Sequence, residues 1–282
     1  MCVRLRNRTA SEPEEKQRIY RKEAKTMKKI KRETIISIVV VILIFVLWFI
    51  STANEWVDTK LIPSPQQVWK AFIDACKDYK GHTLLAHMGV SMQRLFSAFG
   101  LAVITAVPLG LLSGFSKTVR AVMEPIIEFY RPLPPLAYYT LLVLALGIDN
   151  ASKIALLYLA CFAPIYVSCV SAVVRVNKDH INSAYTLGAS KGQVFFSVIF
   201  PSCLPDMFTG LKTSIGVGYS TLVAAEMVAA NAGIGWMVLD AKNWLRNDIV
   251  FVGIIIMGIT GILMNVILGL LEKKLVPWSG KA

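Results

Sequence analysis

The 282-residue sequence contains few residues whose spacing could support catalysis. Its three histidines do not form the H-E-x-x-H pattern of a zinc site, and its five cysteines form no C-x-x-C pair. The nearest approach to a phosphate-binding loop, GFSKT at 114–118, has the wrong glycine spacing for G-x4-G-K-[ST]. We therefore predict that the chain is not an enzyme, that it holds no metal or cofactor, and that it does not bind ATP through such a loop.

Three ionisable residues within or beside long apolar runs are candidate contacts for a charged substrate. Glu226 is the one acidic residue between Lys212 and Asp240, and an ionisable group inside a membrane-spanning segment often has a function. Its place near the predicted outer end of a helix favours a structural or gate-lining role with interfacial hydration, and direct substrate contact is the alternative. Arg94 and Lys212 could attract an anion, but basic side chains near span ends usually extend to lipid headgroups.

The stretch 182–205, NSAYTLGASKGQVFFSVIFPSCLP, carries its own helix signals between two apolar runs. Ile181, Ala184 and Tyr185 have the i, i+3, i+4 spacing of a short helix with one apolar face. Gly188 follows where a helix often ends in the left-handed conformation, which costs glycine no Cβ clash. The spacing thus predicts one short helix that ends at a glycine turn.

A second short helix is predicted to follow that turn. Ser190 and Gln193 have the spacing of a capping box, which starts a helix. Pro201 and Pro205 are expected to stop this helix, because proline lacks the backbone donor that a helix interior needs. Two short helices around a glycine turn would make a compact structure at 178–205, too short and polar to cross a bilayer and suited to docking a partner.

The composition places this loop in an integral membrane protein. Hydrophobic residues make up 55% of the chain and charged residues only 17%, whereas soluble domains usually carry about 25% charged residues. We predict an all-α membrane protein with six transmembrane helices and with further helices at 68–79 and 122–130. The six predicted spans are 34–53, 95–115, 132–148, 154–174, 207–230 and 249–271.

Glycine and proline positions indicate how the spans would pack. The pair Gly110 and Gly114 would let two helices approach closely. The proline-rich break at 132–135 leaves backbone groups that protein neighbours or a water-lined cavity must satisfy, so it indicates either a pathway or a packing kink. The candidate pathway or gate residues are Pro134, Pro135, Ser220 and Glu226.

Most of the positive charge lies in one segment, residues 1–33, which hold twelve Lys or Arg and five Asp or Glu. A basic segment before a span is typical of a cytoplasmic tail near anionic lipid, and no reading module that would indicate nucleic-acid binding accompanies it. We predict a partly disordered basic tail at 1–33 and a transmembrane domain at 34–282. With six spans, both termini and the loop 178–205 would be cytoplasmic.

The loop resembles the E-A-A-x3-G-x9-I-x-L-P pattern of binding-protein-dependent ABC importer permeases. Ala184, Gly188 and Pro201 fall on pattern positions, whereas Asn182 stands in place of the glutamate. Further segments are similar to the taurine, sulfonate and nitrate group of these permeases: RPLPPLAYYTLLVLALGI (131–148), KIALLYLACFAP (153–164), GVGYSTLVAAEMVAANAGIGWMV (216–238) and EKKLVPWSG (272–280).

The resemblance implies a type I importer bundle in the cytoplasmic membrane, whose loop is a coupling helix that inserts into an ATPase. The implied assembly contains a permease homodimer, two ABC ATPase subunits that bind ATP and magnesium, and an extracytoplasmic substrate-binding protein. Nucleotide-driven closure of the ATPases would move the bundles by alternating access. The coupling residues implied by the match are Ala184, Tyr185, Gly188, Ala189, Ser190 and Pro201.

The resemblance favours a small anion as the substrate, with taurine or another sulfonate ahead of nitrate, bicarbonate or a pyrimidine-type molecule. A hypothesis of another class is an ATP-independent carrier or channel. Such a protein would show an internal repeat or a network of charges inside the membrane, and the sequence shows neither.

Overall fold

The computed structural model describes residues 35–278, so the basic tail predicted at 1–33 lies outside the described residues. The chain divides into two compact units, Met1–Pro65 and Gln66–Ala282. In the first unit, the helix Ile35–Ala53 leaves almost all of its isoleucine, valine and leucine side chains exposed. Such a surface on a helix of this length is suited to lipid.

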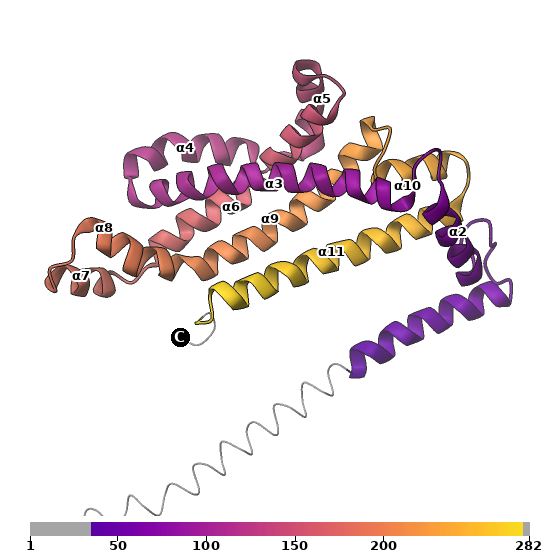
Figure 1. The fold of residues 1–282 in the computed structure, drawn as a ribbon, viewed down its shortest axis with the longest axis horizontal. Helices are drawn as coiled ribbons and strands as arrows, with labels where there is room; N and C mark the ends of the chain where they lie inside the picture. The colour runs from indigo at the N-terminus through magenta and orange to yellow at the C-terminus, as the bar shows by residue number, and fades with distance from the viewer. Residues whose placement is uncertain (1–34, 279–282) are drawn as a thin grey trace, which may run out of the picture. The chain divides into compact units, whose positions relative to one another are not determined.

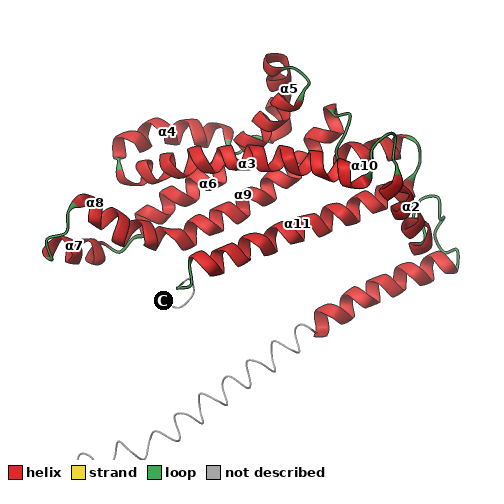
Figure 2. Cartoon of the chain, in the orientation of Figure 1, coloured by secondary structure: helices red, strands yellow, loops and turns green. Residues whose placement is uncertain are grey.

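The described part of the second unit consists of helices joined by loops and turns (Figure 2). Four long helices, α3, α6, α9 and α11, run lengthwise through it, with α7 and α8 near one end and α10 near the other (Figure 1). The elements are α2 (Pro65–Lys77), α3 (Leu84–Phe115), α4 (Lys117–Tyr130), α5 (Pro135–Leu146), α6 (Asn150–Arg175), α7 (Lys178–Thr186), α8 (Lys191–Val194), the π-helical turn η1 (Phe195–Ile199), α9 (Phe200–Ala229), α10 (Ile234–Asn243) and α11 (Asn247–Leu275).

Close packing of α6 between α3 and α9 builds the core of this unit. A Cβ added to Gly110 would lie 2.6 Å from the Cys169 Cβ, and one added to Gly114 would lie 2.5 Å from the Val173 Cβ. Real Cβ atoms do not approach so closely, so only glycine permits this α3–α6 contact. The close approach predicted from the spacing of Gly110 and Gly114 is confirmed.

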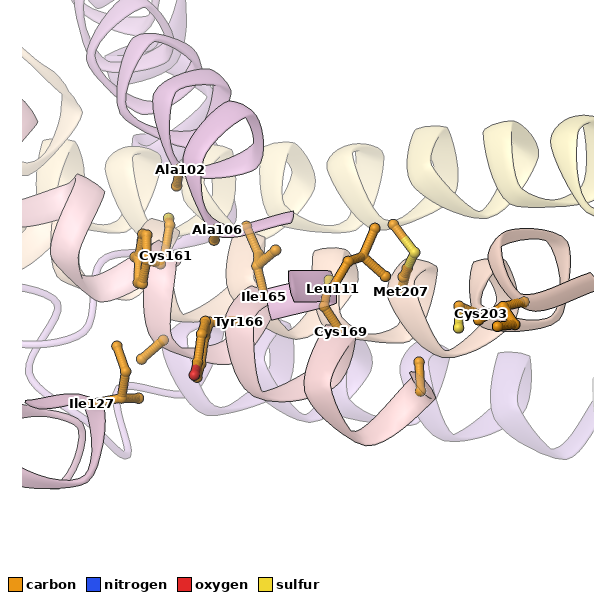
Figure 3. Close-up of a cluster of buried hydrophobic side chains, with 14 of the residues drawn as sticks. Ala102, Ala106, Leu111, Ile127, Cys161, Ile165, Tyr166, Cys169, Cys203 and Met207 are labelled. Atoms are coloured by element: carbon orange, nitrogen blue, oxygen red, sulfur yellow. The ribbon is translucent and has the colours of Figure 1, made fainter. Parts of the chain in front are cut away.

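The largest buried cluster combines side chains of α3, α6 and α9 (Figure 3). Ala106 and Leu111 of α3 face α6, where Cys161 and Cys169 are fully buried. Both cysteines pack as small apolar side chains. The cluster continues through Cys203 and Met207 of α9 to Val194 and Ile199 beside the loop, so the loop and the long helices share one core.

Among residues 35–278, five helices are long and apolar enough to cross a membrane, and not the six predicted. The predicted third span, 132–148, forms α5, which has 12 residues and is therefore about 18 Å long at 1.5 Å per residue. The hydrocarbon core of a bilayer is roughly 30 Å thick. The helix begins only at Pro135 because prolines supply no backbone donor to an earlier turn.

The prediction that Pro201 and Pro205 end the second loop helix is wrong. Helix continues from Lys191 to Val228, with Pro201 in the first turn of α9 and Pro205 inside it. The π-helical turn η1 precedes Pro201, and the Phe200 N–H bonds to the Phe195 carbonyl, five residues back. This wider turn admits a proline, because the ladder already departs from the i to i−4 pattern at that point.

Candidate functional site

The loop between α6 and α9 has the short first helix, the glycine turn and the capping box that its sequence predicted, whereas its second helix continues into α9. Helix α7 ends at a turn in which Gly188 has φ +84°. The Gly188 N–H donates to the Tyr185 carbonyl (2.9 Å) and the Ala189 N–H donates to the Ala184 carbonyl (3.1 Å). These two bonds form a Schellman motif, which explains why glycine occupies the left-handed position.

A capping box starts the second helix of the loop. The Ser190 Oγ accepts from the Gln193 N–H (3.4 Å), and the Gln193 Oε1 accepts from the Ser190 N–H (2.8 Å). Both bonds are local, so the turn Gly188 to Ser190 has a defined conformation. A rigid turn of this kind can present neighbouring side chains to a partner.

Two large apolar side chains are exposed on the loop, among polar neighbours. Leu187 is 88% exposed and Tyr185 is 46% exposed, beside the glycine turn. A hollow of about 840 Å³ lies next to them. Its lining includes Ala184 of α7, Pro201 of α9 and Trp278 from the carboxyl-terminal segment. Of the predicted coupling residues, two line this hollow, Tyr185 flanks it, and the other three, Gly188, Ala189 and Ser190, form the turn.

A second pocket, called here the central pocket, has a volume of about 400 Å³ and lies where α4 gives way to α5. Its walls come from the middle of α6 and from α9, and its rim includes Arg131. Pro135 lines it, whereas Ser220 is exposed on α9 one turn beyond the lining residue Val217. The lining residues are Tyr130, Arg131, Leu133, Pro135, Tyr138, Leu159, Ala160, Ala163, Pro164, Val167, Ser168, Thr213 and Val217.

Glu226 lies in a buried polar cluster and not at a hydrated interface as predicted. It is 1% exposed, and its carboxylate accepts from the Arg94 guanidinium (2.7 Å), the Ser91 hydroxyl (2.8 Å) and the Gly235 N–H (2.9 Å). A Cβ at Gly233 would lie 2.4 Å from this carboxylate. The cluster therefore ties α3 and α9 to the turn that leads into α10.

The two basic residues considered as anion contacts are both paired, so the expectation that they reach headgroups is not met. Arg94 also donates to the Asn150 side chain (2.8 Å) and to the Ala232 carbonyl (2.8 Å). Lys212 donates to Glu272 and so joins α9 to α11. Sequence reasoning missed these pairs because each partner lies at least 56 residues away.

Arg131 was not singled out from the sequence, although it borders the proline-rich break. Its side chain makes no ion pair or side-chain hydrogen bond with any other residue of the described chain, and it is exposed. An arginine placed directly between a helix and a proline-broken segment was the available signal. Among residues 35–278, no cluster of three potential metal ligands is present.

A second polar group, outside the long helices, joins the α2–α3 loop to α10. Asp240 accepts from the Tyr79 hydroxyl (2.8 Å) and from Lys80 (2.8 Å), and the Lys80 ammonium lies 4.7 Å from the Trp244 ring centroid. Burial alone would raise the pKa of Asp240, but the hydrogen bonds from Lys80 and Tyr79 lower it below its usual value. Burial and the same carboxylate raise the pKa of Tyr79.

Residues 106–277, more than half of the chain, match the family described as "Binding-protein-dependent transport system inner membrane component". The chain belongs to this family. It is a multi-pass protein of the cell membrane and a transport component, not an enzyme.

Relatives within the family cover most of the chain. The taurine transport system permease protein TauC of Escherichia coli (strain K12) is 38% identical over 94% of this chain and 97% of its own length. The putative aliphatic sulfonates transport permease protein SsuC of Bacillus subtilis (strain 168) is 30% identical over 83% of this chain and 84% of its own. The nitrate import permease protein NrtB of Synechocystis is 31% identical over 86% of this chain and 90% of its own.

A solved structure shares the fold. A chain of the MetNI methionine ABC transporter, solved in inward-facing conformations, matches with a TM-score of 0.54 over 73% of this chain and 97% of its own. Its sequence identity is 14%, so the likeness concerns the fold alone. The predicted importer-permease bundle is confirmed, with α5 shorter than a full span.

Proposed function

We propose that the chain is the permease subunit of an ATP-driven importer that carries taurine or another small sulfonate into the cell. The observation that carries this proposal is the 38% identity to a taurine permease over nearly the whole of both chains. A sulfonate permease and a nitrate permease at about 30% identity support a small oxyanion as the substrate class.

The partner proposed for the α7–α8 loop is a cytoplasmic ABC ATPase, which would bind ATP and magnesium. Exposed Leu187 and Tyr185 offer apolar contacts, and the Schellman and capping-box bonds fix the turn that presents them. The shared core from Val194 to Met207 gives a packed route from the docked loop into α9. In this proposal, both termini lie in the cytoplasm, two permease copies pair, and an extracytoplasmic protein delivers the substrate.

Reconstitution of the permease with its ATPase in proteoliposomes, with its binding protein added outside, tests the proposal. We expect uptake of radiolabelled taurine or a short alkanesulfonate that needs ATP and the binding protein. Unlabelled nitrate, bicarbonate and a pyrimidine serve as competitors. Uptake of none of these substrates, or uptake without ATP, would contradict the proposal and favour a carrier or a channel.

A further inference from the structure

The central pocket lies about midway along the long helices α6 and α9. Its α6 lining runs from Leu159 to Ser168, the middle of a helix that spans Asn150–Arg175. Its α9 lining, Thr213 and Val217, lies well inside the continuous helix from Lys191 to Val228. The pocket is therefore far from both ends of the bundle.

Arg131 is costly at this depth unless something compensates its charge. An arginine at the centre of a membrane-spanning helix costs about 2.5–3.5 kcal/mol on insertion scales, and such residues face a protein interior or a water-filled cavity. Glu226 compensates Arg94 and Glu272 compensates Lys212, but no carboxylate lines the central pocket within the described chain. The guanidinium of Arg131 is thus a free positive charge at mid-depth.

Tyr130 adds an unused hydrogen-bond donor beside this charge. Its hydroxyl oxygen is buried and has no hydrogen-bond partner among the described residues. A buried polar group of this kind costs roughly 1–3 kcal/mol and calls for an explanation. Because Tyr130 lines the central pocket, a change of its side-chain rotamer would bring the hydroxyl to an acceptor bound there.

The rest of the lining fits a small organic anion. Helix α5 begins at Pro135 on the pocket wall, and no side chain caps its amino-terminal end, where the helix dipole is positive. Leu159, Val167 and Val217 supply apolar walls for a short carbon chain. The volume of about 400 Å³ lies at the small end of the roughly 300–1,000 Å³ of ligand pockets.

We infer that the central pocket is a transit site for the oxyanion head of a small organic sulfonate, which Arg131 holds by charge and Tyr130 by a hydrogen bond. This inference depends on the proposed function, because a transit site for a sulfonate can exist only in a permease that carries anions. Bidentate guanidinium–oxyanion contacts would position the head, and the apolar walls would receive the carbon chain. Arg131 and Tyr130 are then substrate-binding residues inside the membrane, separate from the site on the external binding protein.

The first test compares Arg131→Gln, Arg131→Lys and Tyr130→Phe in reconstituted proteoliposomes. We expect Arg131→Gln to lower the maximal rate of taurine uptake at least tenfold, Tyr130→Phe about threefold, and Arg131→Lys to retain part of the rate. ATP hydrolysis stimulated by the loaded binding protein should persist in all three. Lys117→Gln, which removes an exposed cation from the same helix away from the pocket, is the matched control and should transport normally.

The second test measures charge in the pocket without transport. Thr213→Cys, made in a background with Cys2 and Cys76 changed to serine, places a thiol on the pocket wall; the other three cysteines are buried. The measured quantity is the reaction rate of this thiol with a sulfonate-bearing, negatively charged methanethiosulfonate, divided by its rate with a neutral methanethiosulfonate. We expect this ratio to be at least fivefold higher when Arg131 is present than in the Arg131→Gln variant. Millimolar taurine should slow the charged reagent.

The outcomes separate the two proposals. If the wild-type complex takes up no small anion, the proposed function fails, whatever the thiol reactivities are. If the wild type transports taurine but Arg131→Gln transports equally well and leaves the reagent ratio unchanged, the transit site is overturned. Loss of the permease pair in Arg131→Gln, measured as a halved mass by light scattering, would also overturn it and place Arg131 at an interface between copies.

Discussion

Arg94 and Glu226, 132 positions apart in the sequence, face each other across 2.7 Å with side chains that are 7% and 1% exposed. A pair buried this deeply is sensitive to the loss of one partner, because the remaining charge is left without compensation. The pair joins α3 to the last turn of α9, close to the turn at Gly233.

Removing one member of this pair should destabilise the protein more than removing both. Glu226→Gln is expected to cost about 3–5 kcal/mol because it leaves the Arg94 charge buried and unpaired. Adding Arg94→Gln should recover part of that loss. Thermal unfolding of the purified permease in detergent measures both variants, with Glu124→Gln, an exposed carboxylate on α4, as the control. Equal stability of Glu226→Gln and the wild type would refute the structural role of the pair.

The glycine turn of the loop should be required for capture of the ATPase. Gly188 has a positive φ, so Gly188→Val places a β-branched side chain in a strained conformation and should disturb the turn. Gly188→Asn should be tolerated better, because asparagine accepts the left-handed region. Co-purification of the ATPase with the permease is the measurement, and we expect at least a tenfold loss for the valine variant. Retention of full capture by the valine variant would contradict the importance of the turn.

The exposed apolar side chains of the same loop can be tested without altering its backbone. Leu187→Asp puts a charge at the most exposed apolar position of the turn and should weaken ATPase capture by about tenfold. Leu187→Met keeps an apolar side chain and serves as the control. Normal folding of both variants is verified by thermal unfolding in detergent, so that a loss of capture reports on contact. If the aspartate variant binds as the wild type does, another surface holds the ATPase.

The close contact between α3 and α6 should not tolerate even one added methyl group. Gly110→Ala would bring a Cβ to 2.6 Å from the Cys169 Cβ and 2.9 Å from the Tyr166 carbonyl oxygen, and the expected cost is about 1–3 kcal/mol. Gly100→Ala on the same helix meets no atom within 4 Å and should be neutral or slightly stabilising. A chemical-denaturant titration in detergent compares the two. Equal stability of the two variants would show that the helices can separate.

Acid should weaken the contact between the α2–α3 loop and α10. The pKa of Asp240 is lowered in the folded protein, so its contribution to stability is complete above its unfolded value, near 3.9, and is lost as the pH falls through the lower folded value. Asp240→Asn removes this contribution and should flatten the fall in melting temperature below about pH 4. If the variant and the wild type lose stability in parallel, the Tyr79–Asp240–Lys80 contact does not contribute to acid sensitivity.

Sequence reasoning predicted the features of this protein that depend on neighbours along the chain. The turn at Gly188 and the capping box from Ser190 to Gln193 are local, and both were predicted with the correct residues. The pairing of Glu226 with Arg94 depends on how three helices pack, so residue spacing along the sequence does not predict it. Pro201 does not end the helix, because a π-helical turn, which carries no sequence signature, accommodates it.

In the candidate site, too, the local features were predictable from the sequence and the tertiary contacts were not. The composition of the loop indicated docking, and its conformation was predictable in outline. The central pocket was not predictable, because Tyr130, Arg131, Ser168 and Thr213 line one pocket only through the tertiary arrangement of the helices. Pro135 was chosen as a pathway residue and does line the pocket, whereas Glu226 belongs to a separate cluster.

The unbroken helix from Lys191 to Val228 has a mechanical consequence. At 1.5 Å per residue, its 38 residues extend over about 57 Å, from the turn at Ser190 to the neighbourhood of the Arg94–Glu226 pair. A rotation of one end of this helix can turn the other end directly, without a chain of side-chain contacts between them. We expect the π-helical turn η1 to be the most easily twisted point of this helix. Rotation of the loop end would then rotate the far end of the helix, reduced by whatever twist η1 absorbs.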